Sequence, residues 1–150
     1  MKFSEMTYTR PDPAASKQRL SALTAELKAA KSYKEARKVF LSQQELMSHI
    51  STAATLASIR HSIDTRDEFY DGEEKFWNNF NPELEEYNQA WTAAMLESPF
   101  RADFEKEYGD LMFVNAEIAL KTFSPAIIPE LQQENDLTQE YEKLLASAQI

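Results

Sequence analysis

The sequence predicts an all-α protein, a helical bundle of about five to seven helices, because apolar residues recur three and four positions apart through much of the chain. Glycine is scarce, with 2 in 150 residues, while 43% of the residues are hydrophobic. Such a composition is typical of helices rather than of a turn-rich β fold. Polar residues that cap helices stand before several of the apolar repeats. We therefore expect one helical domain over residues 1–150, long enough to bury a core.

The first expected helix spans residues 13–31. Asp12 is suited to cap it, because its carboxylate can accept hydrogen bonds from free N–H groups at the helix start. Pro13 fits the first helical position, where no N–H donor is needed. The apolar face of this helix is marked by Leu20, Leu23 and Leu27.

Two long helices are expected to form a central pair that meets near residues 62–66. Ser32 and Glu35 form a capping box that opens the first of the pair, and Thr65 and Glu68 form another that opens its partner. The partner helix carries an aromatic stripe that is more typical of core than of a ligand-binding wall. The stripe consists of Phe69, Phe76, Phe80, Leu84, Tyr87 and Trp91. Pro82 is expected to kink this segment or to restart it.

The last third of the chain predicts three shorter helices. Ser98 and Pro99 start the first, which Gly109 can terminate. Asp110 caps the second, over residues 111–123. The third is marked by Leu131, Leu137, Tyr141 and Leu144.

A polar seam interrupts the apolar pattern where the central pair meets. The helix face that carries Ala54 and Ala57 continues to His61 and Asp64, so the spacing predicts burial of this polar pair. The candidate residues of the seam are Arg60, His61, Asp64, Arg66, Asp67, Glu68 and Tyr70.

Two interpretations of the seam stay open. In the structural one, Arg60 and Asp64 form an ion pair one helical turn apart, and an aspartate stabilises the start of the next helix. In the functional one, Arg60, His61, Asp64, Arg66, Asp67 and Tyr70 line the wall of a cleft, where His61 with Asp64 orients a substrate or binds a metal. Most paired buried charges are structural, so the first interpretation is favoured.

Charge and composition exclude several classes of protein. The net charge is −9, divided into +5 over residues 1–63 and −14 over residues 64–150. We expect the basic early helices to pack against the acidic later ones, and the 9 acidic residues among 64–86 to form a solvated face. An acidic chain of this kind is a poor nucleic-acid binder. No cysteine, secretory signal or membrane-length apolar run is present, so we expect a cytoplasmic protein with no membrane partner.

Two long segments carry a family resemblance. LASIRHSIDTRDEFYD and KTFSPAIIPELQQENDLTQEYEKLLASAQI resemble the N-terminal region of oligoendopeptidase F-type zinc metallopeptidases, relatives of thimet oligopeptidase. Members of that family are several times longer. The resemblance, together with a C-terminus that looks like the opening of another element, implies an N-terminal helical domain whose catalytic zinc domain is absent from this chain.

The resemblance also implies a role. The N-terminal helices of that family form a lid or channel wall that admits short peptides and excludes folded proteins. Its zinc is held by a His-Glu-x-x-His helix and a further Glu, with the intervening Glu acting as general base. The histidines here are His49 and His61, neither followed by Glu, so we expect no catalytic residue, no metal ligand and no peptidase activity from this chain alone. The implied partners are the missing catalytic domain and, in the whole enzyme, short peptides; self-association through exposed apolar surface is also expected.

Two alternatives belong to other classes of protein. The first is a stand-alone helical interaction module that presents an acidic face. The second is a metal-binding bundle built on His61, which is weaker because Glu45 and His49 lie four apart rather than at the three-residue spacing of di-iron bundles. His49 is expected to be an ordinary, partly buried histidine.

Overall fold

The computed structural model describes residues 5–122 and 124–147. Within these residues the chain is all-α, with six α-helices and no strand, which confirms the predicted fold class. Phe123, expected at the end of the fifth helix, and the final residues 148–150 lie outside the described part.

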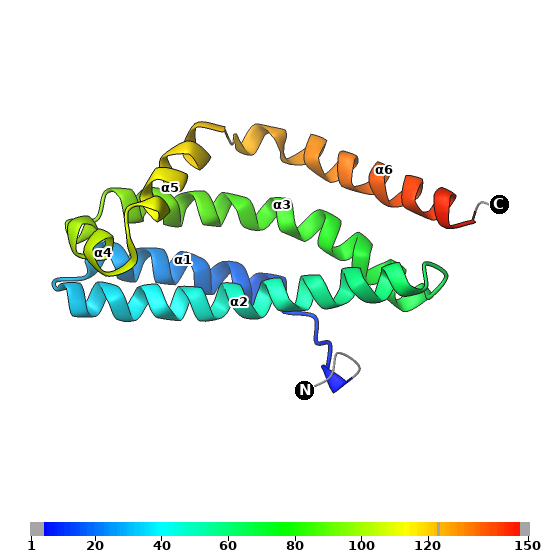
Figure 1. Cartoon of the computed structure of the whole chain (residues 1–150), viewed down its shortest axis with the longest axis horizontal. Helices are drawn as coiled ribbons and strands as arrows, with labels where there is room; N and C mark the ends of the chain where they lie inside the picture. The colour runs from blue at the N-terminus through cyan, green and yellow to red at the C-terminus, as the bar shows by residue number, and fades with distance from the viewer. Residues whose placement is uncertain (1–4, 123, 148–150) are drawn as a thin grey trace.

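The helices follow one another with short connections (Figure 1). Their bounds are α1 Pro13–Ala29, α2 Tyr33–Ile63, α3 Glu68–Leu96, α4 Arg101–Tyr108, α5 Leu111–Thr122, the 3₁₀ helix η2 Pro125–Ile127 and α6 Ile128–Ser147. The long helices α2 and α3 meet through a turn at residues 64–67, which confirms the predicted central pair.

The helix α3 lies at the centre of the arrangement. It packs against α1 and α2 on one side and against α5 and α6 on the other. Figure 1 shows α6 running along the side of α3 that faces away from α1 and α2. The molecule therefore consists of a three-helix bundle with an additional helix laid over its third member.

The core is built at two levels along the bundle. One cluster joins α1, α2 and α3 around Trp77, Phe80 and Leu84. The other joins α1 to α5 around Phe40, Trp91 and Phe104. An eight-residue helix such as α4 is too short to be stable alone, so Phe104, which is fully buried, anchors it. Burial of a side chain of this size contributes about 1.5–3 kcal/mol.

The predicted caps of the first two helices are present. The Asp12 carboxylate accepts from the Ala15 N–H at 2.7 Å, and the Ser32 hydroxyl accepts from the Glu35 N–H at 3.3 Å. The Glu35 carboxylate reaches back to the N–H of Lys31 at 2.8 Å rather than to that of Ser32. Both helices therefore begin where side chains satisfy N–H groups that lack a partner within the helix.

The predicted cap of the third helix is wrong. The N-cap of α3 is Asp67, whose Oδ1 accepts from the N–H groups of Phe69 and Tyr70 at 2.9 and 3.1 Å. Residues 64–67 form a turn in which the Asp67 N–H donates to the Asp64 carbonyl at 3.1 Å. Thr65 lies inside this turn, so it cannot start the helix.

The segment around Pro82 is one helix. Pro82 lies within α3, which continues unbroken from Glu68 to Leu96, so the predicted restart does not occur. Proline has no N–H to donate to the residue four positions earlier, which leaves the Asn78 carbonyl without its helical partner.

The uneven charge of the chain gives rise to ion pairs between helices. Lys17 of α1 pairs with Glu83 of α3, and Arg37 of α2 pairs with Glu107 of α4 at 2.7 Å. These contacts confirm the predicted packing of basic early helices against acidic later ones.

Candidate functional site

The six cleft-wall candidates lie in three separate places. Arg60 and Tyr70 form one group, His61 lies apart from them beside Asp71 and Glu74, and the remaining three occupy the turn between α2 and α3. The candidates are Arg60, His61, Asp64, Arg66, Asp67 and Tyr70.

Arg60 joins the turn to the N-terminal arm. Its Nη1 donates to the Tyr70 hydroxyl at 2.6 Å, and its Nη2 donates to the Met6 carbonyl. The guanidinium carbon lies 5.5 Å from the centre of the Tyr70 ring, within the range of a cation–π contact. The structure therefore gives Arg60 a partner on α3 and another in the arm that precedes α1.

The predicted ion pair between Arg60 and Asp64 is wrong. Asp64 follows the last residue of α2 with an extended backbone, at φ −142° and ψ 98°, so its side chain no longer stands one turn above Arg60. Its Oδ1 accepts from the Arg66 backbone N–H at 3.1 Å and Nε at 3.2 Å, and these hydrogen bonds lower the pKa of Asp64. Asp64 is exposed, which also contradicts its predicted burial.

His61 is buried, as the helical spacing predicts, with 1% of its surface exposed. Its Nε2 lies 3.5 Å from Oδ1 of Asp71, an aspartate of α3 that sequence reasoning did not single out. Asp71 also receives Lys75 Nζ at 3.2 Å, Lys143 Nζ, and Gln139 Nε2 at 3.0 Å. Burial raises the pKa of Asp71, but the hydrogen bonds from Lys143 and Lys75 outweigh it and lower the pKa.

Glu74 lies beside His61, and its pKa is raised whereas that of Asp71 is lowered. Its Oε2 and the Nε2 of His61 are buried and have no hydrogen-bond partner among the described residues. Burial is the largest cause of a raised pKa for Glu74, and the nearby carboxylates of Glu142 and Asp71 raise it further, while His61 opposes them. This is an ionisable pair with unused hydrogen-bonding capacity at the α2–α3–α6 junction.

An amide network continues the contact between α3 and α6. The Asn135 amide donates to the Asn78 carbonyl at 3.2 Å, which is the carbonyl that Pro82 leaves without a helical partner. The Asn78 amide in turn donates to Gln139 Oε1 at 3.1 Å, and Gln132 Nε2 donates to the Asn79 carbonyl at 2.9 Å. We call this whole surface the α3–α6 polar interface, and its main residues are Asp71, Glu74, Asn78, Asn135, Gln139 and Lys143.

A sequence signal for this interface exists. Asp71, Glu74 and Asn78 are spaced three and four apart and share one face of α3. Asn135, Gln139 and Lys143 are spaced four apart on α6. Two polar stripes of this kind are also what two solvent-exposed faces would show, so the pattern alone does not pair them.

The buried carboxylate of Glu73 holds the N-terminal arm, the residues that precede α1. Glu73 is 3% exposed and accepts from the Tyr8 hydroxyl and from Arg10, whose Nε lies 2.9 Å from Oε2. The hydrogen bond from Arg10 lowers the pKa of Glu73, while burial and the Glu73 contact raise the pKa of Tyr8 to about 12. Glu73 is buried and Asp71 and Glu74 are partly so, which corrects the expectation that residues 64–86 form a uniformly solvated acidic face.

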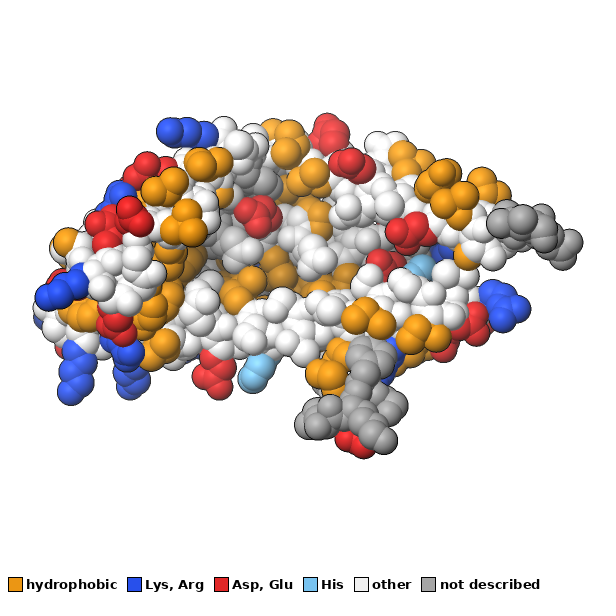
Figure 2. All heavy atoms as spheres, in the orientation of Figure 1, with side chains coloured by type: hydrophobic (Ala, Val, Ile, Leu, Met, Phe, Trp, Pro, Cys, Tyr) orange, Lys and Arg blue, Asp and Glu red, His pale blue; other side chains and the backbone are white. Residues whose placement is uncertain are grey.

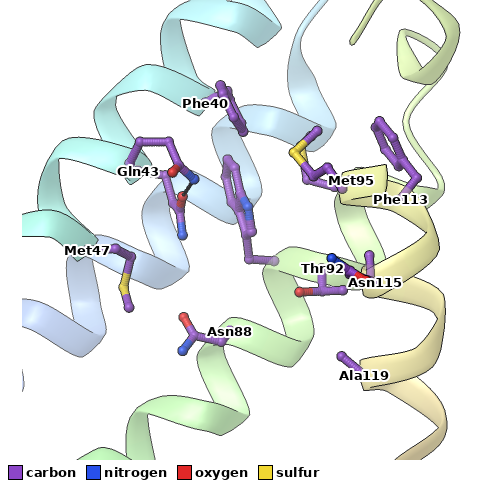
Figure 3. Close-up of a pocket in the computed structure, with 13 residues that line it drawn as sticks. Phe40, Gln43, Met47, Asn88, Thr92, Met95, Phe113, Asn115 and Ala119 are labelled. Atoms are coloured by element: carbon purple, nitrogen blue, oxygen red, sulfur yellow. Dashed lines mark hydrogen bonds between the residues drawn. The ribbon is translucent and has the colours of Figure 1, made fainter. Parts of the chain in front are cut away.

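An apolar groove opens between α2, α3 and α5 (Figure 3). Its volume is about 420 Å³, within the range of ligand pockets. Its apolar part includes Phe40, Trp91, Met95 and Phe113, and Gln43 and Asn88 contribute amides. Figure 2 shows hydrophobic side chains inside a hollow between α2 and the α5–α6 segment. The aromatic stripe of α3 is mostly core, as predicted, and Trp91 also lines this groove.

The acidic and histidine side chains of the described residues do not gather into a metal site. Among residues 5–122 and 124–147, no group of three or more His, Asp or Glu side chains is arranged to hold a metal ion. His49 is exposed, which corrects the expectation that it is partly buried. The zinc implied by the family resemblance therefore does not fit a site within this part of the chain. The described helices also include none that is long and apolar enough to cross a bilayer.

The all-α fold is that of a helical domain, and a model described as the Peptidase M3 N-terminal domain matches residues 3–123. The chain belongs to the peptidase M3 N-terminal domain family. A comparison with curated proteins found no match.

Three solved structures are similar over the whole chain. An X-ray structure of a protein assigned as oligoendopeptidase F is 40% identical, with a TM-score of 0.96 over 100% of this chain and 26% of its own. PZ peptidase A, solved with an inhibitor, is 38% identical, with a TM-score of 0.95 over 99% and 26%. A protein from Bacillus anthracis strain Ames, also assigned as oligoendopeptidase F, is 37% identical, with a TM-score of 0.96 over 100% and 28%. The chain thus spans 26 to 28% of the length of these proteins.

Proposed function

We propose that this chain serves as the N-terminal domain of a zinc-dependent oligoendopeptidase and forms one wall of a channel that admits short peptides. The observation that carries the proposal is the family match over residues 3–123, together with similarity to much longer peptidase chains at TM-scores of 0.95 to 0.96. The domain contributes shape and exclusion of large substrates. The zinc and its ligands belong to another part of the enzyme.

Exposed apolar faces support a domain that packs against more protein. On α5, Leu111, Val114 and Ile118 are 66%, 47% and 55% exposed. On α6, Tyr141 and Leu144 are 60% and 67% exposed. Apolar surface gathered in stripes on two neighbouring helices is typical of interaction surfaces rather than of a free face.

The stand-alone interaction module has weaker support. Fewer carboxylates are available on its acidic face than the sequence suggests, because Glu73 is buried and Asp71 is paired with Lys143 of α6. The cytoplasmic location expected from the sequence stays a prediction. The third class, a metal-binding bundle, would need a ligand group that the described residues do not form.

A chimeric enzyme tests the proposal. The corresponding N-terminal region of the 40% identical oligoendopeptidase F protein is replaced by this chain. Cleavage of a quenched fluorescent peptide and of a folded globular protein is then measured. We expect chelator-sensitive cleavage of the short peptide and none of the folded protein. A folded, zinc-loaded chimera that digests folded proteins would contradict the channel-wall role.

The isolated chain provides the matching control. With added zinc it should show no chelator-sensitive turnover of the same peptide. Turnover by the chain alone would contradict the proposal that the chemistry lies in another part of the enzyme.

A further inference from the structure

The apolar groove is lined without a charged side chain. Among the described residues that line it, none is ionisable, although 27% of the chain is charged. Phe40, Trp91 and Phe113 are at most 6% exposed and form its buried apolar part. A charged ligand would lose its hydration here without gaining a counter-charge, so the groove favours an uncharged apolar one.

The polar groups of the groove suit a peptide. Its rim carries the side-chain amides of Gln43, Gln44, Asn88 and Asn115, and each amide can both donate and accept, as a peptide group does. Gln43 is 5% exposed; its Oε1 accepts from Gln44 Nε2 at 2.8 Å, while its own Nε2 donates to no described residue. The Nε2 of Gln43 therefore lines the groove and can donate to a ligand carbonyl.

We propose that the groove binds one large, uncharged apolar residue of a peptide, with the amide rim pairing with the peptide groups on either side. A volume of about 420 Å³ accommodates a Leu or Phe side chain together with its flanking amides. The inference rests on the proposed function only in that peptides are the ligands. Binding to the groove needs neither zinc nor the catalytic part, so it can succeed or fail independently of the chimera.

Tryptophan fluorescence provides the test. Trp91 lines the groove, whereas Trp77 lies in the other core cluster and donates to the Tyr8 hydroxyl at 3.1 Å. In the Trp77→Phe variant, titration with N-acetyl-leucine amide should change the Trp91 emission saturably. N-acetyl-glutamic acid amide should bind at least about tenfold more weakly. Backbone NMR shifts of Thr92 and Asn115 in the unchanged chain give a second readout.

Matched variants locate the binding. Ala119→Phe places a ring in the groove and should weaken binding more than about tenfold, whereas Val114→Phe, on the exposed face of the same helix, should leave binding unchanged. Gln43→Met keeps the length of the side chain but removes the amide, and should weaken binding about three- to tenfold.

Several outcomes would overturn the proposal. They are the absence of saturable binding to the folded chain, equal binding of the charged probe, and unchanged binding by a folded Ala119→Phe variant. A change in Trp91 emission that follows protein concentration without any probe, accompanied by dimers in light scattering, would assign the groove to a second copy of the chain instead.

Discussion

Two adjacent glutamates show how strongly the position of a side chain on its helix controls its contacts and its pKa. Glu73 and Glu74 follow each other on α3 and therefore project about 100° apart around the helix. Glu73 meets Tyr8 and Arg10 of the N-terminal arm, while Glu74 lies toward His61 and Glu142. The pKa of Glu73 is lowered by Arg10 and that of Glu74 is raised by burial, so their contributions to stability have opposite signs.

Glu73→Gln should destabilise the protein at neutral pH. Removing a buried carboxylate that accepts from a guanidinium costs about 1–3 kcal/mol. A lowered pKa means that this stabilisation is complete above the unfolded value of 4.5 and is lost as the pH falls through the folded value. Urea unfolding should therefore show a gap from the unchanged protein near pH 7 that narrows in acid. A gap that widens in acid would contradict the assignment.

Glu74→Gln should stabilise the protein at neutral pH, by about 1 kcal/mol, because an unpaired buried acceptor loses its charge. A raised pKa means that the ionised carboxylate destabilises the fold increasingly as the pH rises from the unfolded value of 4.5 through the folded one. The gain should therefore vanish below about pH 4.5. The same unfolding series serves both variants, and a loss of stability near pH 7 would refute this prediction.

At the scale of the elements, α6 is attached in an unusual way. Its polar side faces α3 and its apolar side faces outward, with Leu137 and Leu144 at 58% and 67% exposed. Among the residues of α6, Gln139 alone is buried. The helix is therefore held by hydrogen bonds and ion pairs. One of the hydrogen bonds runs from the Asn135 amide to the Asn78 carbonyl, which accepts no helical hydrogen bond from Pro82.

Gln139→Ala should loosen α6 without unfolding the three-helix bundle. Gln139 links Asn78 and Asp71 to α6, and loss of these hydrogen bonds costs about 1.4 kcal/mol, equivalent to a tenfold change in opening. Hydrogen exchange of residues 128–147 should accelerate about tenfold, while exchange in α1 to α3 stays unchanged. Gln133→Ala, at an exposed position of the same helix, is the control. Equal exchange in both variants would show that the polar interface does not hold α6.

At the scale of the whole molecule, α5 and α6 carry stripes of exposed apolar side chains and lie on the opposite side of α3 from the α1–α2 pair (Figures 1 and 2). This arrangement suits a domain that is completed by other protein. It also makes association between copies of the chain favourable when that protein is not bound.

Leu144→Glu should reduce self-association of the chain. The unchanged chain should show an average mass that rises with concentration in light scattering, because the stripe on α6 can pair with a second copy. A charge within the stripe should shift the chain toward monomer. Leu41→Glu, at a 44% exposed position of α2, should not. A monomer at every concentration would remove the support for an interaction surface on α6.

Much of the fold could be predicted because the signals are local. Asp12 and Ser32 cap helices with their own side chains, and Gly109 ends α4 with a φ of 87°, a conformation that glycine adopts readily. Capping and periodicity depend on residues a few positions apart, so the printed sequence contains them. The cap at Thr65 failed because a turn at residues 64–67 competes with it, and Asp67 satisfies the same N–H groups.

The sequence by itself determined an all-α chain, the extent of its long central helices and its resemblance to a peptidase family. Only the tertiary structure decided that His61 meets Asp71, that Arg60 turns to Tyr70, and that the polar rather than the apolar face of α6 lies on α3. The physical reason is that periodicity identifies which residues share a face, whereas the partner of that face depends on how helices distant in sequence pack together.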